Sequence, residues 1–303
     1  MPQALVLIVG MVLLGWLFRQ LKLLPDASAD VLNALVLKLC FPALVLSVLP
    51  KLSLSAAVLK IALIAWIVMA LSALVIHLIA RAQRYKPDVE GCLLLTAVLG
   101  NTAFLGYPLT QAYLGSEHLP QAVIYDQLGS FLIFSTFGLW VAAHFSGGKS
   151  PTAAQTMQKI ISFPAFMALI VGLALSYTST ALPDWLSSLI ASIGALLVPL
   201  AMFAVGLNFR LRGAPGFGMP LLIGLSCKML LAPLIALGLA AFILPKDAHA
   251  LVVLQASMPP MATAAALAAS AGLRADLAAA MAGFGVLLAM LWTPILLSLM
   301  PGY

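Results

Sequence analysis

Residues 93–108 have the sequence LLLTAVLGNTAFLGYP, and residues 251–263 have the sequence LVVLQASMPPMAT. Each lies in an apolar segment of membrane-spanning length, and each contains helix breakers in its middle. Because proline lacks a backbone donor and clashes with the preceding turn, neither segment is expected to form one simple helix. Unpaired backbone groups survive in a membrane only where they line a cavity inside the protein. Matched interruptions in two halves of a chain are typical of the binding site of a secondary transporter.

The composition indicates a polytopic membrane protein. Of 303 residues, 63% are hydrophobic and 8% are charged, and the mean hydropathy is +1.13. Soluble domains carry about 25% charged residues. Residues 5–21 lack a basic n-region and a cleavage site, so we expect a retained helix and not a signal peptide. The three cysteines, Cys40, Cys92 and Cys227, lie in apolar runs and are interpreted as small packing residues, not as disulfide partners.

Hydropathy predicts ten spans, since a helix needs roughly 20 residues to cross the bilayer. The spans cover residues 4–21, 29–49, 56–80, 89–113, 121–144, 159–177, 184–208, 217–244, 248–271 and 276–299. The loops on one side hold Arg19, Lys22, Arg81, Arg84, Lys86, Lys149, Lys159, Arg210, Arg212 and Arg274, and the other side holds Lys51, Lys60 and Lys246. The positive-inside rule places the basic side in the cytoplasm and both termini outside the inner membrane. The net charge of +6 thus reports topology, and we expect no nucleic-acid partner.

The two halves of the chain repeat. Leu-Pro-Asp occurs at residues 24–26 and again at 182–184, in each case before a span with a proline near its middle. The pairs Pro25 and Pro183, Pro42 and Pro199, and Pro108 and Pro260 are 158, 157 and 152 residues apart. These separations predict a duplication of five helices, with residues 1–147 and 148–303 as the repeats. Because five is odd, the second repeat is inverted, as in alternating-access carriers.

The predicted fold is an all-α polytopic membrane protein with ten transmembrane helices, arranged as a 5+5 inverted repeat. Its fourth and ninth helices are broken crossover helices. Helix N-termini exposed at such breaks carry partial positive charge and unpaired N–H donors, which suit a carboxylate. Side chains of Asn101 and Thr102 add polar groups at the first break, and those of Gln255, Ser257 and Thr263 at the second. These groups either bind substrate or only satisfy the freed backbone, and both interpretations stay open.

Charged and polar residues inside the spans are further candidates. Asp126, followed by Gln127, is a candidate to carry a proton or hold a sodium ion, or else an interfacial residue. Lys228 is a candidate to balance the charge of a substrate, and Lys38 is considered for the same role. Either lysine could instead extend along its stem toward an interface. The histidines His77, His118, His144 and His249 lie near span ends and are interpreted as interfacial.

Enzyme motifs are absent from the sequence. We find neither a Cys/His metal cluster nor a phosphate-binding loop, and we predict no enzyme, no metal site and no cofactor. A passive anion channel is the stronger alternative, because interrupted helices also build selectivity filters. An anion-sensing receptor is a third hypothesis.

Four motifs resemble those of the auxin efflux carrier family, and the likeness runs over nearly the whole chain. The motifs are GNTAFLGYPL at residues 100–109, YDQL at 125–128, PLAMFAVGL at 199–207 and MPP at 258–260. The family includes plant auxin carriers and bacterial permeases, some of them for malate or malonate. The resemblance implies a scaffold domain from helices 1, 2, 6 and 7, a transport domain from helices 3–5 and 8–10, elevator-like movement and dimers.

The resemblance also implies roles for particular residues. Asn101 and Thr102 would face the substrate carboxylate, and Pro108 and Pro260 would be the crossover prolines, with Pro259 beside the second. Gln127 or Asp126 would match the polar position of the fifth helix. The chain departs from the plant carriers in its short central loop and in the alanine-rich residues 262–267, which lack a second asparagine. The serine that those carriers have after the second-helix proline is either replaced by Val45 or displaced to Ser47.

These departures favour a small bacterial-type organic anion over an auxin-like aromatic carboxylate. The sequence therefore predicts a secondary active transporter of a mono- or dicarboxylate such as malonate or malate. The expected partners are the anion, a co-transported proton or sodium ion, membrane lipid and a second copy of the chain.

Overall fold

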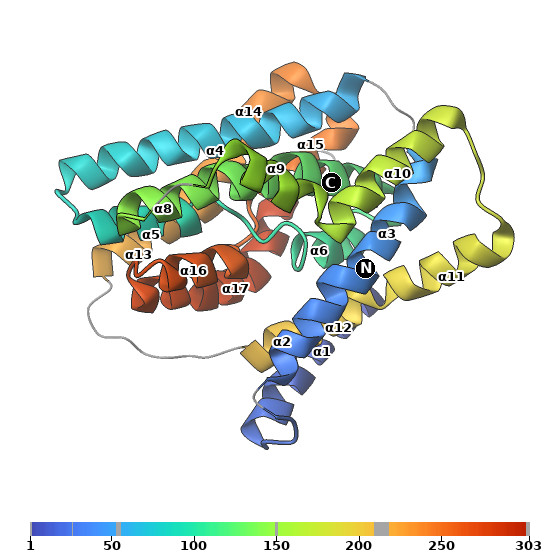
Figure 1. Cartoon of the computed structure of the whole chain (residues 1–303), viewed down its shortest axis with the longest axis horizontal. Helices are drawn as coiled ribbons and strands as arrows, with labels where there is room; N and C mark the ends of the chain where they lie inside the picture. The colour runs from blue at the N-terminus through green and yellow to red at the C-terminus, as the bar shows by residue number, and fades with distance from the viewer. Residues whose placement is uncertain (1, 26, 53–55, 149–150, 209–217, 301–303) are drawn as a thin grey trace. The chain divides into compact units, whose positions relative to one another are not determined.

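The computed structural model describes residues 2–25, 27–52, 56–148, 151–208 and 218–300, and these are nearly all helical (Figure 1). Within those ranges the only pairing of extended backbone is an isolated bridge between Gly100 and Pro260. Among the described residues, six segments are long and apolar enough to cross a membrane: Ser28–Lys51, Val58–Ala82, Ser116–Ser146, Asp184–Asn208, Gly218–Ile243 and Ala275–Ser298. The predicted class, an all-helical polytopic membrane protein, is thereby confirmed. Lys149, Arg210 and Arg212 of the predicted basic side lie outside the described residues.

The described residues contain fewer than ten single helices that are long enough to span a membrane. A seventh span is obtained if α9 (Ala153–Ile161) and α10 (Pro164–Thr178), which meet at 68°, count as one. The helix α1 (Pro2–Gln20) is also apolar along Val6–Gln20. The predicted fourth and ninth spans correspond to α5 (Pro87–Thr96) with α6 (Gly106–Tyr113), and to α15 (His249–Ala256) with α16 (Ala262–Ser270). Helices of 8 to 10 residues reach only about half-way through a bilayer core of about 30 Å.

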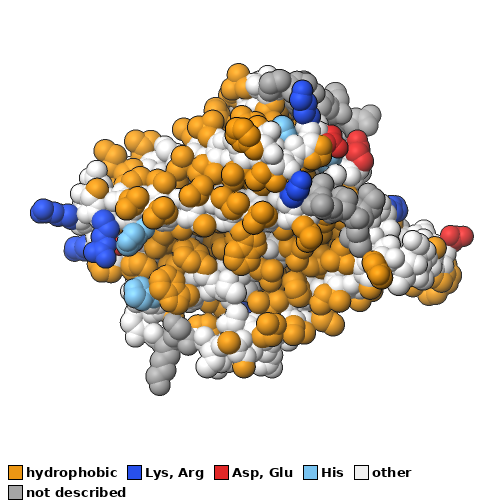
Figure 2. All heavy atoms as spheres, turned by 90° about the horizontal axis from the view of Figure 1, so that it is seen from above, with side chains coloured by type: hydrophobic (Ala, Val, Ile, Leu, Met, Phe, Trp, Pro, Cys, Tyr) orange, Lys and Arg blue, Asp and Glu red, His pale blue; other side chains and the backbone are white. Residues whose placement is uncertain are grey.

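Many large apolar side chains lie on the surface of the chain. Hydrophobic side chains cover most of the face drawn in Figure 2, where acidic and basic side chains are few. Exposed examples include Leu59, Leu63 and Leu74 on α4 (Ala56–Ala82) and Phe242 on α14 (Ala232–Ile243). Apolar surface of this kind favours association or aggregation in water, whereas lipid tails solvate it at little cost.

The chain divides into two compact units, and the first comprises Met1–Ala56, Tyr107–Val123 and Met157–Arg210. It contains α1, α2 (Ser28–Leu35), α3 (Phe41–Val48), α10, α11 (Asp184–Ala195) and α12 (Leu197–Asn208). Glycines let these helices approach closely. A Cβ on Gly206 of α12 would lie 3.0 Å from the Cα of Gly15 on α1, and one on Gly194 would lie 2.9 Å from the Cα of Leu44. Arg19 also joins α1 to α12, because its guanidinium donates to the Leu207 carbonyl at 2.6 Å.

The second unit comprises Ala57–Gly106, Ile124–Thr156 and Leu211–Tyr303. Its helices are α4, α5, α8 (Leu139–Ser146), α13 (Gly218–Ser226), α14, α15, α16 and α17 (Ala275–Ser298), together with three π-helical turns: η4 (Tyr125–Phe131), η5 (Phe134–Gly138) and η6 (Cys227–Leu231). A fourth π-helical turn, η1 (Val36–Cys40), belongs to the first unit. Such turns displace carbonyls from the regular pattern and are frequent at functional sites. Two of those in the second unit contain Asp126 and Lys228.

Candidate functional site

The two interrupted segments meet inside the second unit. The N–H of Asn101 donates to the Pro259 carbonyl at 2.7 Å, and the N–H of Met261 donates to the Leu99 carbonyl at 2.9 Å. With the bridge between Gly100 and Pro260, these bonds pair residues 99–101 antiparallel to residues 259–261. We call this paired region the crossing. Each break thus supplies partners for backbone groups that the other break frees, as burial in a membrane protein requires.

Glycine makes room on either side of the crossing. A Cβ on Gly285 of α17 would lie 2.5 Å from Pro260 Cδ and 3.1 Å from Pro259 Cβ. A Cβ on Gly100 would lie 2.8 Å from the Nζ of Lys228. All three distances are shorter than van der Waals contact, so a larger residue at either position would displace a proline or the lysine.

Asn101 has a structural task at the first break. Its side-chain carbonyl accepts the N–H of Phe104 at 3.2 Å, and its backbone carbonyl accepts the N–H groups of Leu105 and Gly106 at 3.3 and 3.1 Å. The residue therefore caps the turn that leads into α6. Its side-chain amide nitrogen takes no part in this cap. That nitrogen is a donor suited to an anion.

Thr102, Asp126 and Gln127 form a buried hydrogen-bonded group. The hydroxyl of Thr102 donates to one carboxylate oxygen of Asp126, and Gln127 Nε2 donates to the other at 2.7 Å. Asp126 is 2% exposed, and the other two residues are fully buried. The π-helical turn η4 thus holds its carboxylate against the first break, and not at the surface.

Lys228 lies at the crossing. It is 2% exposed, and its ammonium donates to the carbonyl of Ala256, the last residue of α15, at 3.1 Å. No carboxylate forms an ion pair with it in the part of the chain that the structure describes. By contrast, Lys38 is exposed on η1 of the first unit.

The remaining predicted residues occupy different surroundings. Gln255 is fully buried, and a Cβ on Gly106 would collide with its amide, so it lies beside the start of α6. Ser257 is also buried, and its hydroxyl donates to the Leu254 carbonyl at 2.8 Å, which is a local backbone bond. Thr263 is exposed at the start of α16. Pro108 is buried in the part of α6 that belongs to the first unit.

Comparison with known proteins identifies the family. The family model for membrane transport proteins, which is that of the auxin efflux carrier family, matches residues 2–297. The chain belongs to this family. It is 30% identical over 291 residues to an uncharacterized transporter of Methanothermobacter thermautotrophicus, a match that covers 94% of this chain and 93% of the relative. A second uncharacterized transporter, from Methanocaldococcus jannaschii, is 26% identical over 215 residues, 68% of each chain. The family assignment made from the motifs is therefore confirmed.

The structure of this membrane transporter also contains a partly exposed polar pair that the sequence did not indicate. Nδ1 of His77 on α4 lies 2.6 Å from Oε1 of Glu90 on α5, and Glu90 is 8% exposed. The His77 side chain is 45% exposed, and its interpretation as a surface or interfacial residue stays a prediction. The two residues are on different helices, and no spacing rule links them, so only the packing of α4 and α5 brings them together.

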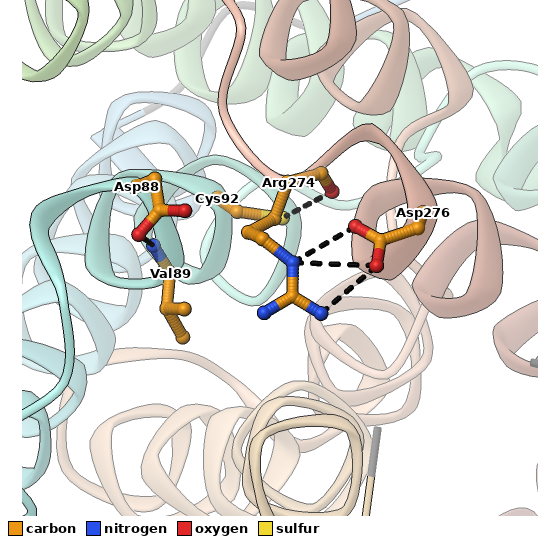
Figure 3. Close-up of polar contacts among 5 residues, drawn as sticks. All are labelled: Asp88, Val89, Cys92, Arg274 and Asp276. Carbon is orange, nitrogen blue, oxygen red and sulfur yellow. Dashed lines mark hydrogen bonds and ion pairs between the residues drawn. The ribbon is translucent and has the colours of Figure 1, made fainter. Parts of the chain in front are cut away.

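A second polar group joins the start of α17 to α5 (Figure 3). The guanidinium of Arg274 makes a two-pronged contact with Asp276, with Nη2 at 2.9 Å from Oδ2, while Cys92 Sγ lies 3.7 Å from the Arg274 carbonyl. The hydrogen bond to Asp276 raises the pKa of Arg274. Since both side chains are substantially exposed, such a pair contributes little to stability. It lies at the start of α17 and is not a candidate substrate site.

Proposed function

We propose that this transporter is a secondary active carrier of a small organic anion, a mono- or dicarboxylate, and that it works by elevator-type alternating access. The observation that carries the proposal is the crossing. Two helices are interrupted at one place, and buried polar side chains gather around them, including Asn101, Thr102 and Lys228. The substrate sites of secondary transporters are typically formed by discontinuous helices of this kind.

The chemistry of the crossing suits a carboxylate. The amide of Asn101 offers a donor beside the first break, and α16 begins directly after Met261 of the crossing, so the first N–H groups of that helix lie close by. Thr263 lies in that first turn. Helix N-termini favour anions through their unpaired donors and partial positive charge. Pro108, Pro259 and Pro260 keep these segments from closing into continuous helices.

The division of the chain supports an elevator. The first unit contains the predicted helices 1, 2, 6 and 7, and the second contains most of the predicted helices 3–5 and 8–10. We assign the first unit as scaffold and the second as transport domain. The ten-span inverted repeat is part of the same proposal, with α5–α6 and α15–α16 each counted as one interrupted crossing of the membrane. The proposal also includes a homodimer, a location in the inner membrane and termini on the external side.

Asp126 is the proposed coupling residue, with Gln127 beside it. Its carboxylate contacts Thr102 in the first break, so a proton or sodium ion bound there would change the site where the substrate is held. Ionisable residues within a membrane commonly serve this purpose in transporters.

Reconstituted protein in liposomes tests the proposal. We expect saturable uptake of labelled malonate, malate or indole-3-acetate, accelerated by the same anion on the opposite side and driven by a proton or sodium gradient. Preferred transport of indole-3-acetate would indicate an auxin-like aromatic carboxylate exporter. Unitary conductance without trans-acceleration would indicate a channel and would exclude the carrier mechanism.

A further inference from the structure

The ammonium of Lys228 is a buried charge with incomplete hydrogen bonding. A lysine has three N–H donors, and the structure provides one acceptor, the Ala256 carbonyl at 3.1 Å. No ion pair compensates the charge within the described part of the chain. A buried charge without a counter-ion is strongly destabilising, and such residues in membrane proteins usually have a function.

The position of this ammonium is as informative as its burial. Nζ lies so close to Gly100 that any side chain there would displace it, because a Cβ would be 2.8 Å from Nζ and 2.9 Å from Cε. Glycine thus gives the ammonium direct access to the backbone of the first break, while its hydrogen bond reaches the residue that ends α15 before the second break. The same cation contacts both interrupted segments.

The second buried charge of this region is already satisfied by other groups. Both oxygens of Asp126 accept hydrogen bonds, from Thr102 and from Gln127. The two buried charges therefore contact neighbouring residues of one break, Gly100 and Thr102, without forming an ion pair with each other. Lys228 is the positive group at this place, and the described residues supply no counter-ion for it.

We propose that Lys228 binds the carboxylate of the transported anion, which replaces the Ala256 carbonyl as its acceptor. This inference rests on the proposed function, and it names the residue that makes the crossing selective for anions. A charge-assisted bond to a carboxylate is stronger than a bond to a neutral carbonyl, so the exchange favours the bound state. Binding also releases the Ala256 carbonyl at the end of α15, so that substrate occupancy changes the hydrogen bonding beside the second break.

A purely structural role for Lys228 is the competing explanation. The last carbonyls of a helix lack intrahelical partners, and a lysine near them is stabilising. In that case the ammonium only caps α15. The two roles differ in the charge they need, because a glutamine amide can still donate to a carbonyl but cannot neutralise a carboxylate.

The first experiment compares Lys228→Gln with Lys38→Gln in the full chain. Both lysines lie in π-helical turns, but Lys38 is exposed and belongs to the other unit. Melting temperature in detergent is measured against rising concentrations of malonate, malate and indole-3-acetate. We expect at least one anion to stabilise the wild type, and we expect Lys228→Gln to raise its half-saturating concentration about tenfold or more. Lys38→Gln should behave as wild type.

A glycine pair provides a test that leaves the lysine in place. Gly100→Ala would put a methyl group against Nζ, whereas Gly238→Ala on α14 has nothing within 4 Å of its new Cβ. We expect Gly100→Ala to weaken anion binding in the same direction as Lys228→Gln, and Gly238→Ala to leave binding unchanged. This pair remains decisive if the lysine variant does not fold.

Three results would overturn the inference. They are an unchanged half-saturating concentration in Lys228→Gln, wild-type binding by Gly100→Ala, or no stabilisation of folded wild-type protein by any of the three anions. Counterflow in liposomes is measured separately. If wild-type counterflow is present but Lys228→Gln binds normally, the carrier proposal stands and this inference fails. If Lys228-dependent binding is present without counterflow, this inference stands and the carrier proposal fails.

Discussion

Single residues at the crossing combine structural and proposed binding tasks. Asn101 uses both of its oxygens to cap the turn into α6, which leaves its amide nitrogen as the group proposed for the substrate. Asp126 and Lys228 are buried, and both form hydrogen bonds to neutral groups. Because one residue can serve folding and binding together, a test at this scale needs variants that separate the two.

Two substitutions of Asn101 make that separation. Asn101→Ala removes the cap and the amide, and we expect a loss of about 1 kcal/mol in stability together with strongly reduced anion uptake. Asn101→Asp keeps an acceptor for the Phe104 N–H but replaces the amide donor with a negative charge. We expect it to fold with near-normal stability and still to lose uptake. Thermal melts and liposome uptake check both, and normal uptake by Asn101→Asp would remove Asn101 from the binding site.

Asp126→Asn tests the proposed coupling. The asparagine can still accept from Thr102, and a rotated Gln127 amide would offer its oxygen to the new N–H₂ group, so we expect the variant to fold. Anion binding should persist, while the pH dependence of uptake should be lost, because the group that would exchange a proton is gone.

Uptake of labelled anion at a series of pH values measures this effect. The matched control is Asp184→Asn, at the exposed start of α11, which should keep the wild-type profile. A wild-type pH profile in Asp126→Asn would show that coupling does not use this carboxylate.

At the scale of elements, close backbone approach holds the first unit together. α1 and α12 pack where Gly15 faces Gly206, and α10 packs on Leu49 through Gly172, where a Cβ would be 2.9 Å from Leu49 Cβ. Small residues that bring helix backbones together are the usual source of helix association in membranes, since lipid provides no hydrophobic drive between helices. The stability of this unit therefore depends on the absence of side chains at a few positions.

Gly206→Ala tests this packing. Its new Cβ would lie 2.9 Å from the backbone nitrogen of Trp16 and 3.0 Å from Gly15 Cα, so one of the helices must shift. We expect a loss of about 1–3 kcal/mol, the usual cost of overpacking. Gly10→Ala on α1 meets nothing within 4 Å and should be neutral or slightly stabilising. Melting temperatures in detergent compare the two, and equal effects would contradict the proposed packing.

At the scale of the whole molecule, each compact unit is discontinuous in sequence. The first takes three stretches of the chain and the second takes three others. In the proposed elevator, the unit that contains the crossing carries the substrate past the other, and the chain passes between units at several points. The direction in which each span passes through the membrane then decides which loops face the cytoplasm.

Cysteine labelling tests the proposed orientation. In a variant without Cys40, Cys92 and Cys227, which are all buried, single cysteines replace Lys246 or Arg84, both exposed. We expect a membrane-impermeant maleimide added outside intact spheroplasts to label Lys246→Cys, because the positive-inside rule places that loop outside. Arg84→Cys should react only after the membrane is opened. The opposite pattern would invert the proposed topology.

The sequence alone determined the class, the family and the places where helices are interrupted. These properties depend on local composition and on proline and glycine, whose effects on the backbone do not require knowledge of distant residues. The count of ten spans followed from hydropathy in the same way. It stays a prediction, because helices of 8 to 10 residues cannot be assigned to a full crossing by length.

Only the tertiary structure decided which residues meet. It paired Leu99 and Asn101 with Met261 and Pro259, brought Lys228 against Gly100, and joined Asp126 to Thr102. It also left Thr263 exposed and gave Ser257 a local backbone bond. Such contacts arise from the packing of helices far apart along the chain, for which hydropathy and spacing contain no signal, so candidates that looked alike in the sequence were separated only by the fold.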